Sequence, residues 1–356
     1  DILGHDDPTV IRMLQDITGV DPKSIPLDDK ETMSLFSSTE ALGLRPDQIN
    51  SEVGTFGIPE FGTKFVRGML LDTLPTTFAD LLCISGLSHG TDVWLGNAKD
   101  LIDAGTVTLS EAVCTRDDIM IYLIKKGLPP NTAFKIMEFV RKGKALKDPE
   151  KWMEYETLMR EHEVPEWYID SCRKIKYMFP KAHAAAYVMM AFRIAWFKVH
   201  IPKAYYAAYF SIRAKAFDAE FMIFGKEKVK EKMKEINSQG NSAAPKDKDM
   251  YDDLEIVLEM YERGFKFLPI DLYKSDATKF KVEDDGLRPP INSISGMGNV
   301  AAESIANAVS MDPPISSIDN LKKRAKIGNA AADLLRKFNC LNGLPESDQV
   351  SFFDII

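Results

Sequence analysis

Apolar residues recur at helical spacing along most of this chain. Asp7 followed by Pro8 is typical of a helix start, in which the aspartate caps and the proline takes the first position. One face of the helix that follows carries Ile11, Leu14 and Ile17. Glycines and prolines separate further segments of helical length. The predicted helices there cover 60–72, 76–84, 96–103, 115–127, 130–142, 147–162 and 166–178.

The second half of the chain combines helices with a little β structure. Charged amphipathic helices are predicted over 219–238 and 251–263, with a linker at 238–247 between them. Phe265–Leu268 and Lys279–Val282 are predicted to be short strands. We therefore expect a mainly α fold, with multi-domain helical regions and a small α/β element.

The length of 356 residues predicts two or three domains. Hydrophobic residues make up 45% of the chain and charged residues 28%, and no apolar run reaches the length of a membrane span. The four cysteines form no C-x-x-C pair, so the spacing of a metal site is absent and reduced thiols in a cytoplasmic protein are expected. The missing initiator Met fits a fragment of a longer protein.

The net charge of −8 argues mildly against nucleic-acid binding, but its distribution matters more. Residues 173–203 contain seven Lys and Arg and no acidic residue, and residues 322–337 contain six against one Asp. Acidic residues concentrate at 218–235 and 247–262. Two local basic faces on an acidic chain can still hold nucleic acid.

The segment 177–200 carries the first candidate chemistry. Phe179-Pro180 predicts a helix start. Lys181, His183 and Tyr187 fall in the first turns, and the last two share a face. A lysine beside a helix N-terminus attracts phosphates, and the alanines between these residues let a flat ligand approach, so the set suits a nucleoside triphosphate. The alternative is a core helix with a solvated lysine at its start.

Two glycine-containing segments precede this helix. In 54–62 the glycines predict a tight turn, and Lys64 and Arg67 lie three apart on the helix that follows. A structural turn beside a solvated helix face explains them equally well.

The second segment, 84–90, is predicted to be a helix, a glycine-containing hairpin and a further helix. Ser88 and His89 could bond a phosphate or a base there, although a structural histidine is an equal alternative. Helix capping suffices to explain Asp117 and Asp118 at the start of the next helix.

Residues 294–305 have the pattern of a helix-hairpin-helix. Gly296, Met297, Gly298 and Asn299 form its hairpin, whose backbone N–H groups would contact a DNA phosphate without reading sequence. A second, weaker copy is predicted at 318–341; its candidate DNA-binding residues are Lys322, Lys323, Arg324 and Lys326. The alternative is that these hairpins only pack.

The end of the chain reads Gln349-Val350-Ser351-Phe352-Phe353, a glutamine followed by apolar and paired aromatic residues. Residues 345–348 give no reason for it to fold back, so a docking peptide is one interpretation and a flexible end is the other.

Several of these strings resemble one family, in the same order along the chain. The segment Phe179–Tyr187 resembles the F-x-K-x-H-A-A-A-Y signature in the fingers of bacterial replicative DNA polymerases of the C family, and Pro180 before Lys181 is most similar to the PolC type. Residues 1–9 resemble the last palm motif, and 54–63, 84–94 and 164–170 are also PolC-like. The resemblance covers essentially the whole chain.

The resemblance implies roles for the two ends of the chain. Asp1 matches the third metal-site aspartate of the palm, a catalytic residue at a two-Mg²⁺ site whose other carboxylates would lie upstream. This chain alone is therefore expected to be inactive. The tail 349–353 is similar to the Q-L-[SD]-L-F motif that binds the sliding clamp, and departs from it at Val350 and Phe352. The resemblance also favours contact of the 54–67 region with nucleotide or template.

The implied domains are the end of the palm and a connection (1–45), helical fingers (46–217), a duplex-binding region with helix-hairpin-helix motifs (218–345) and a clamp-binding tail (346–356). The expected function is template-directed addition of dNTPs to a primer 3′ end. The expected partners are primer–template DNA, dNTP, the sliding clamp and other replisome subunits, with no membrane. The alternatives are a non-catalytic DNA-binding or clamp-docking accessory module, and a purely structural helical protein.

Overall fold

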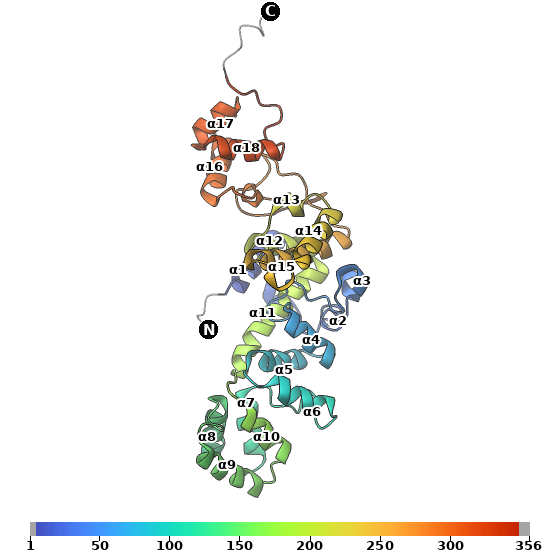
Figure 1. The fold of residues 1–356 in the computed structure, drawn as a ribbon, viewed down its shortest axis with the longest axis vertical. Helices are drawn as coiled ribbons and strands as arrows, with labels where there is room; N and C mark the ends of the chain where they lie inside the picture. The colour runs from blue at the N-terminus through green and yellow to red at the C-terminus, as the bar shows by residue number, and fades with distance from the viewer. Residues whose placement is uncertain (1–4, 349–356) are drawn as a thin grey trace, which may run out of the picture. The chain divides into compact units, whose positions relative to one another are not determined.

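The computed structural model describes residues 5–348 and confirms a mainly α fold with a small β element (Figure 1). The chain divides into two compact units. Among the described residues, the first consists of 5–7, Ser24–Leu42 and Ser51–Trp196, and the second of Pro8–Lys23, Gly43–Asn50 and 197–348. The domain boundaries expected from the sequence remain predictions.

The first unit is helical, with turns and one isolated β-bridge between Thr91 and Tyr177. Its helices are α2 (Lys30–Ser34), α4 (Lys64–Thr73), α5 (Phe78–His89), α6 (Lys99–Asp103), α7 (Arg116–Lys125), α8 (Pro130–Arg141), α9 (Pro149–Glu161), α10 (Glu166–Lys174) and most of α11 (Lys181–His200). Phe36 anchors its core, because its ring lies 5.0 Å from Phe61 and 6.1 Å from Phe192, measured between centroids.

The second unit contains the remaining helices and a two-stranded antiparallel sheet, β1 (Lys281–Glu283) and β2 (Gly286–Arg288), with Lys281 opposite Arg288. Its helices are α1 (Asp7–Thr18, less its first residue), α3 (Pro46–Ile49), the end of α11, α12 (Pro202–Ile212), α13 (Ala219–Met222), α14 (Lys226–Ser238), α15 (Pro245–Glu262), α16 (Asn299–Val309), α17 (Ile318–Ala325) and α18 (Asn329–Lys337). Helices α16 to α18 share one apolar core with Ile270 and Leu272.

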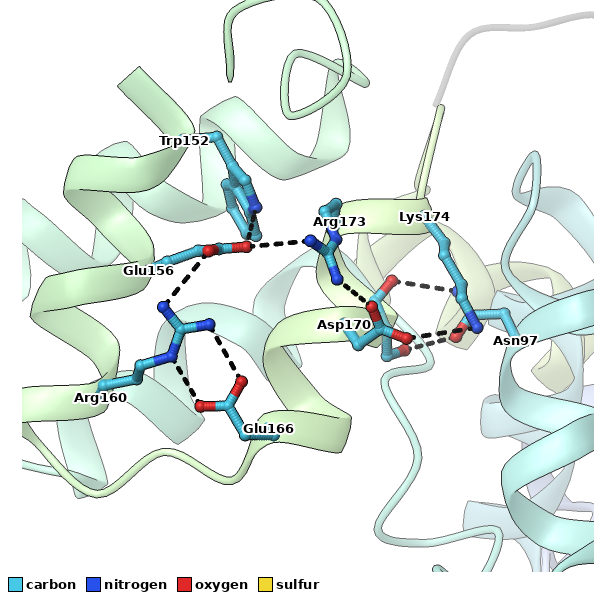
Figure 2. Close-up of polar contacts among 9 residues, drawn as sticks. Asn97, Trp152, Glu156, Arg160, Glu166, Asp170, Arg173 and Lys174 are labelled. Carbon is cyan, nitrogen blue, oxygen red and sulfur yellow. Dashed lines mark hydrogen bonds and ion pairs between the residues drawn. The ribbon is translucent and has the colours of Figure 1, made fainter. Parts of the chain in front are cut away.

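A polar network joins α9 to α10 in the first unit (Figure 2). The buried carboxylate of Glu156 accepts a hydrogen bond from Nε1 of Trp152 at 2.5 Å and lies 3.4 Å from a guanidinium nitrogen of Arg160. Arg160 also pairs with Glu166 at 2.7 Å. A carboxylate loses hydration on burial, so these partners are what make its position tolerable.

Several predicted boundaries were wrong, for local reasons. Helix α5 runs through Gly86 without a hairpin, because this glycine serves packing: a Cβ built there would lie 2.5 Å from the carbonyl oxygen of Cys114. Helix α10 ends at Lys174 because Tyr177 pairs with Thr91 in a β-bridge. The predicted helix 219–238 breaks at Gly225, whose φ is +105°.

The predicted positions of the β strands and of the linker were also wrong. Helix α15 begins at Pro245, a favourable first helical position, inside the predicted linker. The strand β2 was missed, and the predicted strand 265–268 contributes only an isolated bridge between Phe267 and Leu287. Within residues 5–348, no helix is long and apolar enough to cross a membrane.

The basic run 173–203 does not form the open basic face predicted from its composition. Five of its seven cations pair with acidic side chains that lie elsewhere in the sequence or on the same helix. Lys198 is fully buried and lies 2.8 Å from Glu259, while Lys176 pairs with Asp92 at 2.7 Å. Arg173 pairs with Asp170 on its own helix. Charge counted along the chain therefore overstates the positive surface here.

Candidate functional site

Lys181 begins α11, and its charge is already paired. Its Nζ lies 3.0 Å from Oδ1 of Asp118, and its backbone N–H donates to Oδ2 of Asp117 at 2.7 Å. The hydrogen bond that Lys181 donates to Asp118 raises the pKa of Lys181 above its ordinary value. A phosphate that reaches this ammonium group must therefore compete with Asp118 or share the lysine with it.

Asp118 also fixes the start of α7. Its other carboxylate oxygen accepts hydrogen bonds from the backbone N–H and the hydroxyl of Thr115, both at 2.8 Å. The backbone N–H of Arg116 donates to the carbonyl of Phe179 at 3.1 Å. The starts of α7 and α11 are thus tied together. Capping explains part of the role of Asp118, as predicted, while the pairing with Lys181 was missed.

Three of the singled-out segments meet at a cluster of histidine rings. Nε2 of His89 lies 2.8 Å from a carboxylate oxygen of Glu60, which belongs to the glycine-containing loop before α4. The ring of His183 lies 6.1 Å from His89 and 4.4 Å from Tyr187. Phe179 flanks both histidines, at 5.5 Å from His89 and 5.0 Å from His183.

The two histidines have opposite electrostatics. The hydrogen bond with Glu60 raises the pKa of His89, whereas burial lowers the pKa of His183. His89 therefore keeps its positive charge to higher pH than His183 does. A cation beside clustered aromatic rings suits a ligand that has both a flat base and negative charge.

The other nucleotide-binding candidates in this unit either bond to nearby groups or are exposed to solvent. Arg67 donates to the carbonyl oxygen of Gly62 at 2.9 Å, and its guanidinium carbon lies 4.3 Å from the ring centre of Phe56. The hydroxyl of Ser88 donates to the carbonyl of Ser85, one turn back, at 3.0 Å. Lys64 is exposed in the first turn of α4. Arg67 thus supports its own loop in this structure.

The hairpin before α16 lies in the second unit. Gly296 has φ of +87°, Met297 is buried, and Gly298 is extended before the helix begins at Asn299. No described side chain caps this helix. Backbone N–H groups at an uncapped helix start are available to an anion.

The predicted second copy is also a pair of helices joined by a short hairpin, α17 and α18. Lys326 takes the positive-φ position at +53°, and the N–H of Ile327 donates to the carbonyl of Lys322 at 3.1 Å. Among the predicted basic residues, Lys323 and Lys326 are exposed, Lys322 pairs with Asp319 at 3.0 Å, and Arg324 donates to the carbonyl of Pro313.

Residues 345 and 346 lie against the start of α17, whereas the tail 349–353, which was not expected to fold back, lies outside the described residues. The N–H groups of Ile318 and Asp319 donate to the carbonyls of Pro345 and Glu346, at 2.9 and 3.0 Å. These N–H groups start α17 and have no partner within the helix, which is why the chain returns to them. The clamp-binding candidates 349–353 and the metal candidate Asp1 lie outside the described residues.

The described residues offer no cluster of three or more His, Cys, Asp or Glu side chains that could hold a metal ion. They therefore do not fit a Mg²⁺ site by themselves.

Residues 7–163 match the model of the bacterial DNA polymerase III alpha subunit finger domain, and residues 264–349 match that of a helix-hairpin-helix motif. The matches place the chain in a class, the alpha subunits of bacterial DNA polymerase III.

Full-chain comparison narrows this class. The chain is 56% identical over 353 residues to the DNA polymerase III PolC-type of Clostridium perfringens and to that of Bacillus subtilis, and 52% identical to that of Thermotoga petrophila. Each match covers 99% of this chain and about a quarter of the relative, 24%, 24% and 25% in turn. The chain belongs to the PolC-type family of DNA polymerase III and spans about a quarter of its members' length.

Sequence reasoning missed Glu60 and the pairing of Asp117 and Asp118 with the start of α11. Glu60 is conformationally unusual, because it is a non-glycine residue with φ of +68° in a glycine-containing loop. This angle is seen only in the structure, so the sequence did not single Glu60 out. The two aspartates lie more than sixty residues from Lys181, so no local pattern connects them.

Proposed function

We propose that this chain is the fingers and duplex-binding part of a PolC-like replicative DNA polymerase, which adds dNTPs to a primer 3′ end under the direction of a template. The observation that carries the proposal is the identity of 56% over 353 residues to PolC-type polymerases, which covers 99% of this chain. The match with the finger-domain model supports the same assignment.

In this proposal the start of α11 holds the incoming nucleotide. Lys181 exchanges Asp118 for a phosphate oxygen, and the N-terminus of α11 adds a favourable dipole. His183 and Tyr187 present the flat side of the site, with His89 held in place by Glu60. Lys64 and Arg67 contribute charge from α4, where Lys64 is the more accessible of the two.

The duplex is held by the hairpins of the second unit. Their backbone N–H groups contact phosphates, and Lys323 and Lys326 add positive charge. Such contacts carry no sequence information, as a replicative enzyme requires.

Two parts of the proposal rest on residues outside 5–348. Asp1 would contribute one carboxylate to a Mg²⁺ site completed by the rest of the polymerase, and Gln349–Phe353 would bind the sliding clamp. We assign no step to a metal ion, since the described residues do not hold one.

The test is nucleotide use by the complete polymerase with Lys181→Ala. Loss of a charge-assisted hydrogen bond of about 1.5–3 kcal/mol lowers kcat/KM for dNTP by about tenfold to a hundredfold. Lys176→Ala is the matched control, because Lys176 is an exposed lysine of the same segment that pairs with Asp92. An unchanged kcat/KM in Lys181→Ala would contradict the proposal, as would an equal loss in both variants.

A further inference from the structure

Two free thiols share a small cavity beside Lys181. Cys83 of α5 is half-buried and Cys114, just before α7, is buried. Both line a cavity of about 210 Å³ whose other walls include Asp80, Asp118 and Lys181. A space of this size admits water, and it also admits small oxidants of similar polarity.

The backbone holds the two cysteines close to each other. Gly86 lies one turn after Cys83 on α5, and a Cβ at Gly86 would meet the carbonyl oxygen of Cys114 at 2.5 Å. The glycine therefore lets α5 approach the segment before α7 closely. The two cysteines therefore line the same cavity from adjacent segments.

The pair is chemically asymmetric. The hydrogen bond from Cys114 lowers the pKa of Cys83, with Lys181 acting in the same direction and burial, Asp118 and Asp80 opposing. The same hydrogen bond and burial raise the pKa of Cys114 well above its ordinary value. A half-buried thiol with a lowered pKa beside a second thiol is the arrangement found in redox-sensing cysteines.

We propose that Cys83 and Cys114 form a redox-active pair, in which a small peroxide oxidises Cys83 and Cys114 then closes a disulfide. The Cys83 thiol attacks one oxygen of hydrogen peroxide, giving a sulfenic acid and one water. The Cys114 thiol displaces the hydroxyl of that sulfenic acid as a second water, leaving the S–S bond. Two thiols lose two electrons and two protons in total, and one peroxide becomes two waters.

The disulfide acts on the start of α11 through α7. Bonded sulfurs lie about 2.05 Å apart, so closure draws Cys114 toward α5. Thr115, the next residue, caps α7 together with Asp118, and Asp118 pairs with Lys181. Oxidation therefore displaces the carboxylate that holds Lys181. This consequence for nucleotide use rests on the proposed function, whereas formation of the disulfide does not.

The experiment treats the complete polymerase with hydrogen peroxide, blocks the remaining thiols with a maleimide, and maps disulfides by mass spectrometry of the digest. We expect a Cys83–Cys114 cross-linked peptide that dithiothreitol abolishes. Cys172 and Cys340 serve as internal controls that stay reduced, because burial raises the pKa of both, that of Cys340 to about 12. Failure to find the cross-link, or equal oxidation at Cys172 and Cys340, would overturn the proposal.

Nucleotide incorporation is measured on the same samples. Oxidation should lower kcat/KM for dNTP by about tenfold, as for loss of one charge-assisted contact, and dithiothreitol should restore it. Cys83→Ser should keep normal activity before treatment and lose the sensitivity. A cross-linked enzyme with unchanged incorporation would refute the link to Lys181. The proposed function is judged separately, by reduced enzyme carrying Lys181→Ala.

Discussion

The hairpin between α7 and α8 and the hairpin between α17 and α18 have the same backbone arrangement in different units. Each contains a residue with positive φ, +91° at Gly127 and +53° at Lys326. In each, the next N–H donates to a carbonyl of the preceding helix at 3.1 Å. An extended residue then starts the second helix, and an alanine is buried in its first turn, Ala133 or Ala332.

The two hairpins differ in what they offer to a ligand. Pro129 and Pro130 occupy the start of α8 and have no backbone N–H, whereas Gly328 and Asn329 at the start of α18 keep theirs. The first hairpin is also tied to its own unit, because Nζ of Lys126 donates to the carbonyl of Glu163 at 2.9 Å. Basic residues Lys323 and Lys326 remain exposed on the second.

Under the proposed function, the arrangement of a helix-hairpin-helix fixes how two helices pack, while its backbone donors decide whether it binds phosphate. On this account α7 and α8 use the arrangement for packing alone. The hairpin before α16 has the positive φ, the buried hydrophobic residue and the available N–H groups. It therefore resembles the α17–α18 hairpin rather than the α7–α8 hairpin.

The largest effect is expected from replacing both first helical residues, Asn299→Pro with Asn329→Pro. Each change removes one N–H, and the preceding glycines are extended, as a residue before proline must be. Two lost contacts to phosphate should lower affinity for primer–template DNA by about a hundredfold. Fluorescence anisotropy measures this, with Asn299→Ala and Asn329→Ala as controls that keep the N–H. Equal losses in the alanine controls would contradict the role of the backbone.

A matched pair of glycines separates packing from binding. Gly127→Ala and Gly296→Ala each place a side chain at positive φ, without a neighbour closer than 3.4 Å. Each should cost about 1–2 kcal/mol of stability, measured by urea denaturation. Only Gly296→Ala should also weaken DNA binding, by about tenfold at most. A similar loss of affinity in Gly127→Ala would remove the distinction between the hairpins.

A smaller effect is expected from Lys323→Ala, which removes one exposed charge beside the second hairpin. DNA affinity should fall a few-fold, and the slope of log K against log salt should become shallower by about 0.9, the value for one phosphate contact. Lys234→Ala, an exposed lysine on α14, is the control. If the slope is the same in both variants, Lys323 makes no phosphate contact.

The smallest effect is expected from Pro130→Ala, which restores an N–H to the start of α8. DNA affinity should stay unchanged, while stability falls by about 0.4–1 kcal/mol because the unfolded chain gains freedom. The two quantities are measured by anisotropy and by urea denaturation. A clear gain in DNA affinity would show that α7 and α8 already lie on the DNA and lack only the donor.

The sequence predicted the hairpin before α16 because glycine, hydrophobic residue, glycine and alanine all stand at the expected spacing. At 127–130 it predicted only a break between helices, because the prolines replace residues of the helix-hairpin-helix pattern. Gly86 was misinterpreted as a turn for the opposite reason: a glycine inside a helix is required by a neighbour that lies far away in sequence.

The candidate nucleotide site was predicted in part. Lys181, His183 and Tyr187 follow from one helical segment, and the structure joins His183 to His89 and Glu60. The acidic partners could not be predicted, because Asp117 and Asp118 come from another helix and fold against α11 only through tertiary packing. The same limit applies to the buried pair of Lys198 and Glu259.

The central claim is that backbone donors of the hairpins before α16 and α18 hold the duplex without reading its sequence. The most direct measurement is anisotropy of the polymerase on several primer–templates of unrelated sequence, with and without the Asn299→Pro and Asn329→Pro changes, over a range of salt. The account predicts that affinity falls by the same factor on every duplex and that the salt slope stays the same, because no charged side chain is lost. Unchanged affinity, or a loss confined to some sequences, would contradict it.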